Sequence, residues 1–323
     1  MRLYDFNTYF PDEETCREKF RELRVRQGIV CPKCGCVHHY WKASKEQFQC
    51  AKCGHRTGLR RGTVMQASKL PFRYWFIAMH LLMATKQTFS SLEVQRQLGH
   101  KRYQPIWEMM HKLRSVMGIR DGRYMLNGEI EIDEAFFTTE TPMDKKGRML
   151  KAGAGSERKA KVLVMAESRV VENPRANRKP KRVGFLKMRV LPDLKSSTIS
   201  DSVQSCVNCK GSIAMTDASR SHSRFSEIFD RHVSQVVKPE EIGKVLPWVH
   251  IAIANAKTTI AGTYHGVKAE FLQGYLDEFC YKFNRRHLKD SLFEHLLNAA
   301  IGYKSGFPHR IYNRNLQVVV NAA

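Results

Sequence analysis

The distribution of apolar and polar residues indicates that the first part of the chain is helical. Apolar residues recur at helical spacing over residues 72–83 and 103–117, which predicts two amphipathic helices. Between them we expect a short helix over residues 92–98, with a serine pair at 90–91 as candidate N-caps and Gly99 ending it. Two short helices joined by a glycine-containing turn are typical of a helix-turn-helix, although a plain helical linker has the same pattern.

From residue 129 onward the pattern changes to one dominated by strands. Residues 129–137 alternate strictly, which predicts a strand with Ile130 and Ile132 on one buried face and acidic residues on the other. Further strands are predicted at 161–171, 183–191, 211–217 and 232–237, and helices at 196–207, 223–230, 248–261, 268–285 and 291–303. The basic segment at 173–182 is expected to be a hairpin loop. This order of elements predicts a mixed α/β domain.

The charge of the chain points to a polyanionic partner. The 323 residues include 54 Lys and Arg against 31 Asp and Glu, a formal net charge of +23, and the isoelectric point is about 9.8. No apolar stretch is long enough to span a bilayer, and the first residues contain no apolar signal core. We therefore expect a cytoplasmic protein that binds nucleic acid rather than a membrane.

The acidic residues are concentrated in one part of this basic chain. Residues 121–143 hold six acidic residues and one basic residue, and basic regions lie on both sides of them. An acidic cluster repels the DNA backbone unless a metal ion neutralises it. The cluster is therefore a candidate metal-dependent catalytic site.

The cysteines near the N-terminus have the spacing of a structural zinc site. Two C-x2-C pairs are separated by fifteen residues, and their members are Cys31, Cys34, Cys50 and Cys53. A disulfide framework is the alternative, but it is improbable in a basic cytoplasmic protein. Weaker candidate ligands lie between the pairs: Cys36, His38 and His39.

Several short strings give the chain a family resemblance. IDEAFF, TDAS, NAK, GTYHGV and YLDEFCYKFNRR resemble the ISXO-like insertion-sequence transposases, family 1595, and the cysteine pattern is similar to their N-terminal zinc ribbon. The resemblance implies a ribonuclease-H-like, DDE-type catalytic domain, here residues 121–305, with a mixed sheet and flanking helices. It would follow a zinc ribbon (1–62) and a helical, helix-turn-helix-like region (63–120), and a tail (306–323) would end the chain.

The resemblance also implies a set of catalytic residues. The first two acids of such domains fall on Asp133 in the first strand and Asp217 at the end of the fourth, and they would bind Mg²⁺ or Mn²⁺. The third acid is usually a Glu seven residues before a Lys. Here His250 stands seven residues before Lys257, so we expect His250 to be the third ligand, with Asn255 as the reserve candidate. Imidazole suits Mn²⁺ better than Mg²⁺.

The resemblance implies a DNA partner and a reaction. The chain would bind the terminal inverted repeats of its element as double-stranded DNA, cut them and join them to target DNA, as a dimer or a higher oligomer. The candidate DNA contacts are Lys101, Arg102, Lys112 and Lys257. The alternative is a non-catalytic, zinc-ribbon DNA-binding regulator derived from a transposase, which the missing third acid favours.

Overall fold

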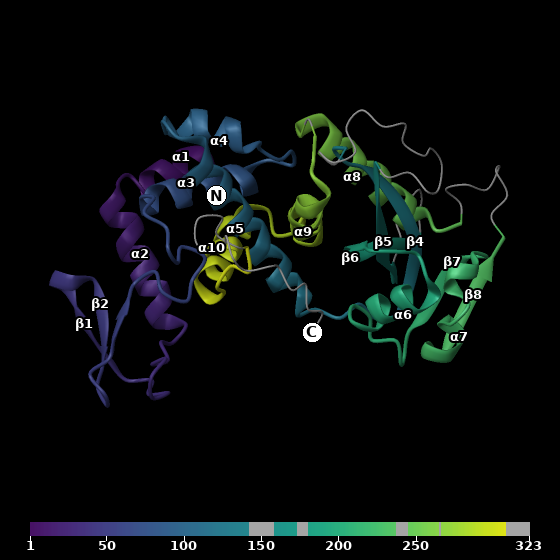
Figure 1. Cartoon of the computed structure of the whole chain (residues 1–323), viewed down its shortest axis with the longest axis horizontal. Helices are drawn as coiled ribbons and strands as arrows, with labels where there is room; N and C mark the ends of the chain where they lie inside the picture. Colours follow the sequence, from purple (N-terminus) through teal and green to yellow (C-terminus); the bar gives the residue numbers. More distant parts are fainter. Residues whose placement is uncertain (142–157, 173–179, 237–244, 265, 308–323) are drawn as a thin grey trace. The chain divides into compact units, whose positions relative to one another are not determined.

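The computed structural model describes residues 1–141, 158–172, 180–236, 245–264 and 266–307. Most of the predicted basic hairpin loop and of the predicted tail lies outside these residues. The chain forms two compact units, residues 1–119 together with residues from 290 onward, and residues 120–289 (Figure 1).

The first unit begins with two helices and a small antiparallel sheet. The helices are α1 (Leu3–Tyr9) and α2 (Glu13–Arg26), and the strands are β1 (His39–Lys42), β2 (Gln47–Cys50) and β3 (Arg56–Gly58), with a 3-10 turn at Ala43–Lys45. The order β1-β2-β3 is a meander in which neighbouring strands are antiparallel. Each cysteine pair lies in a tight turn whose glycine, Gly35 or Gly54, has a φ of +71°. This conformation is one that side chains other than glycine rarely adopt.

The remaining helices of this region begin at or within one residue of the predicted positions, but α5 continues beyond its predicted end at residue 117. They are α3 (Phe72–Ala84), α4 (Ser91–Leu98) and α5 (Tyr103–Gly122). The Ser90 side chain accepts a hydrogen bond from the backbone N–H of Glu93, and Gly99 ends α4 with a φ of +60°. The predicted N-cap and helix stop are thereby confirmed.

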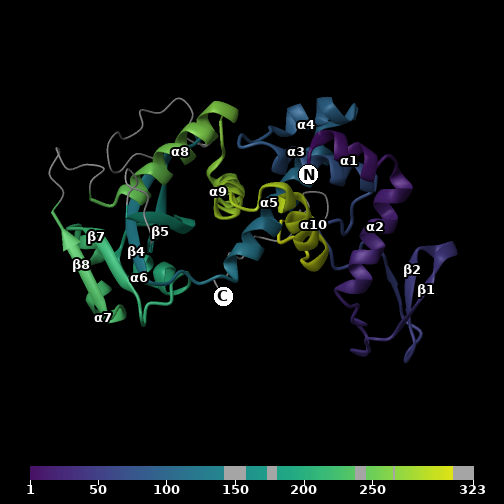
Figure 2. The ribbon, with the colours of Figure 1, turned by 180° about the vertical axis from the view of Figure 1, so that it is seen from behind.

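The last helix, α10 (Leu292–Gly302), belongs to the first unit (Figure 2). The Phe293 ring is buried against the rings of Phe6, Phe10 and Phe76, and the backbone N–H of Val64 donates to the carbonyl of Ala300. The family resemblance leads us to expect this helix in the domain of residues 121–305. The helix is correctly predicted, but its apolar face covers α3, because amphipathic periodicity identifies a buried face without identifying what buries it.

The second unit is built on a five-stranded mixed sheet. Its strands are β4 (Glu129–Thr138), β5 (Lys159–Val170), β6 (Lys181–Leu191), β7 (Ile213–Asp217) and β8 (Arg231–Gln235). They lie in the order β6-β5-β4-β7-β8. The pairs β4–β5 and β5–β6 are antiparallel, whereas β4–β7 and β7–β8 are parallel. This order and these directions confirm the predicted ribonuclease-H-like fold.

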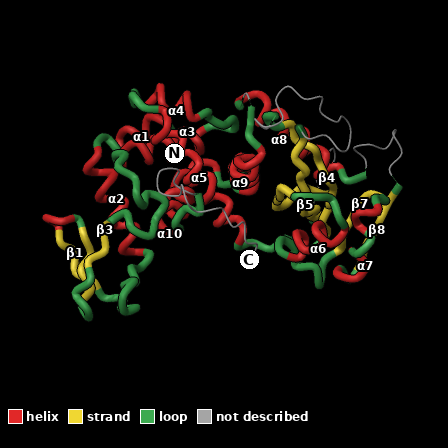
Figure 3. Tube along the Cα trace, viewed as in Figure 1, coloured by secondary structure: helices red, strands yellow, loops and turns green. Residues whose placement is uncertain are grey.

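Helices cover both faces of this sheet (Figure 3). Ile130 and Ile132 face α6 (Ser196–Gln204) and α7 (Phe225–Ile228), whereas Ala135 and Phe137 face α8 (Pro247–Thr263) and α9 (Ala269–Asn284). The sequence predicted only the first of these faces of β4 to be buried. The second is also covered, and Glu131, which appears solvent-facing in the alternating pattern, is 3% exposed.

Candidate active site

The carboxylates of Asp133 and Asp217 are positioned by neighbouring parallel strands. β4 pairs with β7 through Glu131 and Met215, and Asp217 is the last residue of β7. Burial, followed by the nearby charges of Asp217 and Glu134, raises the pKa of Asp133, although the backbone N–H of Glu134 and the His250 ring oppose this rise. The two predicted acids are therefore close enough to repel each other.

Helix α8 runs along β4 and brings His250 to Asp133. His250 Nδ1 lies 3.8 Å from Asp133 Oδ2. Two turns further along α8, the Lys257 ammonium lies 5.8 Å from the centre of the Phe137 ring, on the β4 face that carries Asp133. Asn255 is exposed, on a different face of the helix. The ligand atoms of Asp133, Asp217 and His250 do not all lie within 4.8 Å of one another.

A buried carboxylate fixes the start of α8. The helix begins at Pro247 after Leu246, whose φ is +56°, and it has no side-chain N-cap of its own. Instead, Glu131 Oε2 accepts hydrogen bonds from the backbone N–H groups of Trp248 (2.8 Å) and Val249 (3.1 Å). Burial raises the pKa of Glu131 to about 7, although these two N–H groups act against the rise. Sequence reasoning missed this role, because an acid in an alternating strand is typical of a solvent-facing position.

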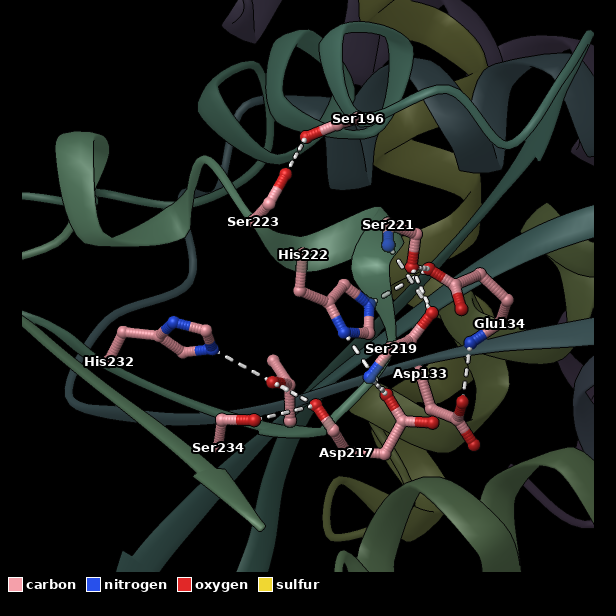
Figure 4. Close-up of polar contacts among 11 residues, drawn as sticks. Asp133, Glu134, Ser196, Asp217, Ser219, Ser221, His222, Ser223, His232 and Ser234 are labelled. Carbon is pink, nitrogen blue, oxygen red and sulfur yellow. Dashed lines mark hydrogen bonds and ion pairs between the residues drawn. The ribbon is translucent and has the colours of Figure 1, made fainter. Parts of the chain in front are cut away.

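His222 is a second residue of the site that sequence reasoning missed (Figure 4). It ends the 3-10 helix Arg220–His222, five residues after Asp217, and its side chain is 1% exposed. Its Nε2 donates to Glu134 Oε1 at 2.8 Å, and its Nδ1 lies 3.1 Å from Asp217 Oδ1. Burial lowers the pKa of His222, but the Glu134 and Asp217 carboxylates outweigh burial and raise it overall. Nothing in the string TDASRSHSRF marks this histidine, since its partner Glu134 is 88 positions away.

The predicted DNA-contacting residues do not all lie on the surface. Lys101 and Arg102 are exposed in the turn between α4 and α5, and Lys257 is exposed on α8. Lys112 is 6% exposed, and its Nζ donates to the carbonyl of Gln66 at 2.9 Å. The amine of Lys112 therefore faces the protein interior, contrary to the prediction, because its position on α5 lies on a packed face.

The four predicted zinc ligands form one tight cluster. Their sulfur atoms all lie within 4.8 Å of one another, and among the described residues this is the one such group of three or more potential metal ligands. The Sγ atoms of Cys31 and Cys53 are 3.6 Å apart, and those of Cys34 and Cys50 are 3.5 Å apart. Cys36, His38 and His39 are not part of this cluster.

The thiols of this cluster have the electrostatics of a metal site. Backbone N–H groups, that of Cys53 first, lower the pKa of Cys50 to about 6. A backbone N–H also acts to lower the pKa of Cys34, but the neighbouring thiols, that of Cys53 first, raise it to about 12. Four sulfurs at these distances cannot all become thiolates unless a cation lies between them, so the donor set fits a tetrahedral zinc ion.

No helix among the described residues is both long enough and apolar enough to cross a bilayer.

Comparison with known proteins identifies the class to which this fold and these sites belong. The transposase zinc-ribbon domain matches residues 11–56, which include all four clustered cysteines. The ISXO2-like transposase domain matches residues 125–284, which include the whole mixed sheet and α8. Residues 125–284 therefore form an ISXO2-like transposase domain, and a transposase zinc-ribbon domain precedes it in the chain.

One curated relative matches the chain over a shorter stretch. It is an uncharacterized protein in the transposable element ISH50 of Halobacterium salinarum, 24% identical over 170 residues. The match covers 49% of this chain and 56% of the relative, so the chain spans little more than half the length of that protein.

Proposed function

We propose that this chain is the active transposase of an insertion sequence, which binds the terminal inverted repeats of its element and catalyses DNA strand cleavage and strand transfer. One observation carries the proposal. Within an ISXO2-like domain, Asp133 and Asp217 lie on adjacent parallel strands, and α8 brings His250 Nδ1 to 3.8 Å from Asp133. The elements that present these side chains are those on which DDE-type transposases carry their catalytic residues.

The donor set suits a divalent cation. Burial and the charges of Asp217 and Glu134 raise the pKa of Asp133, and a bound cation would offset this repulsion. Asp133, Asp217 and His250 would hold Mg²⁺ or Mn²⁺, and the imidazole favours Mn²⁺. When bound, such ions activate the attacking water or 3′-hydroxyl and offset charge on the leaving oxygen.

Other residues of the chain would bind the DNA and the structural zinc ion. Lys257 is exposed two turns beyond His250, where its ammonium can contact a phosphate near the scissile bond. Lys101 and Arg102 would contact the DNA backbone from the turn between α4 and α5. A structural zinc ion held by the four cysteines would fix the ribbon, and pairing of two element ends would require a dimer or a larger assembly.

The test is cleavage and strand transfer on a short duplex that carries the terminal repeat found beside the gene, in Mg²⁺ and in Mn²⁺. We expect Asp133→Asn, Asp217→Asn and His250→Ala to lower the rate by at least about 10³-fold, because each removes a ligand of the reacting ion. Asn255→Ala is the matched control on the same helix and should stay close to wild type.

Two results would change the proposal. Loss of activity with Asn255→Ala but not with His250→Ala would move the third ligand to Asn255. Zinc-dependent binding of the repeat without cleavage by wild type in either metal would instead support a DNA-binding regulator derived from a transposase.

A further inference from the structure

We propose that His222 is a positioning residue of the catalytic site, which holds the carboxylates of Asp217 and Glu134 in a fixed arrangement and thereby sets the affinity of Asp217 for the divalent ion. This inference rests on the proposed function, because it assigns Asp217 as a metal ligand. His222 itself touches neither substrate nor metal in this assignment.

The ring of His222 lies between two carboxylates from different strands, as Figure 4 shows. One ring nitrogen, Nε2, donates to Glu134 Oε1 at 2.8 Å, and the other, Nδ1, lies 3.1 Å from Asp217 Oδ1. Glu134 directly follows Asp133 on β4, whereas Asp217 ends β7. The ring therefore connects β4, the strand that carries Asp133, to the carboxylate of Asp217.

The surroundings of His222 fix the orientation of its ring. The ring packs on Phe225, with the ring centres 5.0 Å apart, and the side chain is 1% exposed. Ser221 Oγ donates to the same Glu134 oxygen at 3.1 Å, and Ser219 Oγ accepts from the backbone N–H of Ser221 at 3.3 Å. Ser219 and Ser221 thus stabilise the turn between β7 and His222, which positions the ring.

The contacts to Asp217 fall on one of its two oxygens. The backbone N–H of Ser219 donates to Oδ1 at 3.1 Å, and His222 Nδ1 faces the same atom. The side chain of Asp217 is 37% exposed, so it is the accessible end of this arrangement. The geometry assigns Oδ2 as the oxygen that Asp217 offers to the metal ion. Loss of the ring would leave Asp217 Oδ1 with the Ser219 N–H but without His222, so its carboxylate would be less firmly oriented, and Glu134 would lose its buried donor.

The test measures metal affinity directly, in the zinc-loaded full chain without DNA. Free Mn²⁺ is followed by electron paramagnetic resonance as the metal is titrated into wild type, His222→Leu, His222→Asn and His222→Gln. We expect His222→Leu to weaken Mn²⁺ binding by roughly 10- to 100-fold, as loss of a residue that orients a metal ligand does. The amide nitrogen of Asn lies near the place of Nδ1 and that of Gln near the place of Nε2, so Asn should recover more affinity than Gln.

His232→Leu is the matched control, because His232 also packs on Phe225 but bonds to Thr216 Oγ1 at 2.8 Å rather than to a carboxylate. Thermal unfolding of each variant distinguishes loss of the fold from loss of positioning. If His222→Leu does not fold, His222→Asn and His222→Gln are compared with wild type instead. Equal Mn²⁺ affinity in wild type and the folded His222 variants, or equal weakening by His232→Leu, would overturn the proposal. Greater recovery by Gln than by Asn would also overturn it, since Glu134 would then be the group that matters.

Cleavage assays with the same variants separate this inference from the proposed function. We expect His222→Leu to need a correspondingly higher Mn²⁺ concentration for half-maximal cleavage, with part of the rate restored by excess metal. If wild type binds Mn²⁺ and cuts no terminal-repeat DNA, the proposed function fails, while the effect of His222 on Mn²⁺ binding still decides the positioning role.

Discussion

The four cysteines of the ribbon come from residues 31–53, whereas the groups of the carboxylate site come from β4, β7, the turn after β7 and α8. In the ribbon, two cysteine turns and the antiparallel pair β1–β2 between them bring four sulfur atoms within 4.8 Å of one another. In the carboxylate site, distant segments bring Asp133, Asp217 and His250 near one another without such convergence. The ribbon is suited to an ion that completes its fold, whereas the carboxylate site holds like charges close together, as the proposed reaction requires.

The two sites also differ in the groups that stabilise their ligands. Backbone N–H groups of the turns favour the thiolate of Cys50. The carboxylate site instead relies on neighbours supplied by the tertiary fold: Glu131 holds α8, and His222 lies between Glu134 and Asp217. A local metal site therefore folds together with its ion, whereas a site assembled from separate strands depends on residues that are not ligands.

Cys50→Ser tests the ribbon half of this comparison and should have the largest effect. Binding of structural zinc contributes on the order of 10–16 kcal/mol to folding in small zinc domains, and a site with three thiolates instead of four should hold the ion much more weakly. We expect loss of about one equivalent of zinc by elemental analysis and rapid reaction of the remaining thiols with a thiol reagent. Cys36→Ser is the matched control, because Cys36 lies outside the cluster. Full zinc retention by Cys50→Ser would contradict the assignment.

Glu131→Gln tests the support of α8 through the pH dependence of stability. Burial raises the pKa of Glu131 from 4.5 to about 7, so the folded state keeps its proton to a higher pH than the unfolded chain. Wild type therefore loses stability as the pH rises from about 4.5 to 7, by up to roughly 3 kcal/mol from this group. Glutamine retains an acceptor oxygen and does not titrate, so the variant should gain stability relative to wild type over this range. Parallel curves of unfolding free energy against pH would rule this out.

Asp133→Asn asks whether the carboxylate site destabilises the fold when no metal is present. Burial and the charges of Asp217 and Glu134 raise the pKa of Asp133, so an uncharged amide removes an unfavourable charge. In metal-free buffer we expect an unfolding midpoint equal to or a few degrees above that of wild type. Added Mn²⁺ should raise the midpoint of wild type and not that of the variant, because only wild type retains the full ligand set. A lower midpoint for Asp133→Asn in both buffers would show instead that this carboxylate stabilises the fold.

Lys257→Gln tests the edge of the carboxylate site and should have the smallest effect on stability. The ammonium lies over the Phe137 ring and is exposed, so its loss should change the unfolding free energy by less than about 1 kcal/mol. Loss of one phosphate contact should reduce by about 1 the slope of log affinity against log salt for terminal-repeat DNA. The matched comparison is Lys112→Gln, which removes a buried amine bonded to Gln66 and should lower stability without altering that slope. A lower salt slope for Lys112→Gln together with a lower stability for Lys257→Gln would show that Lys112 contacts the DNA and Lys257 supports the fold.

The elements of the sheet and the metal-binding cysteines could be predicted from the sequence because their signals are local. Alternation along 129–137 and the spacing of the cysteine pairs depend only on neighbours in the chain. The roles of His222 and Glu131 could not be predicted in this way, because each acts on a residue about a hundred positions away that only the strand order brings close. The partner of α10 and the burial of Lys112 were missed for the same reason, since a helical pattern does not show what covers each face.

The contacts of α10 also determine the order in which the chain can finish folding during its synthesis. The ring of Phe293 packs against the rings of Phe6, Phe10 and Phe76, so the unit that contains α1 is completed by a helix almost 300 residues later in the chain. Residues 120–289 have already been synthesised by the time residue 302 is added. A chain that stops anywhere within residues 120–289 therefore lacks α10 and cannot complete the first unit, so a continuous chain with this unit intact also contains residues 120–289.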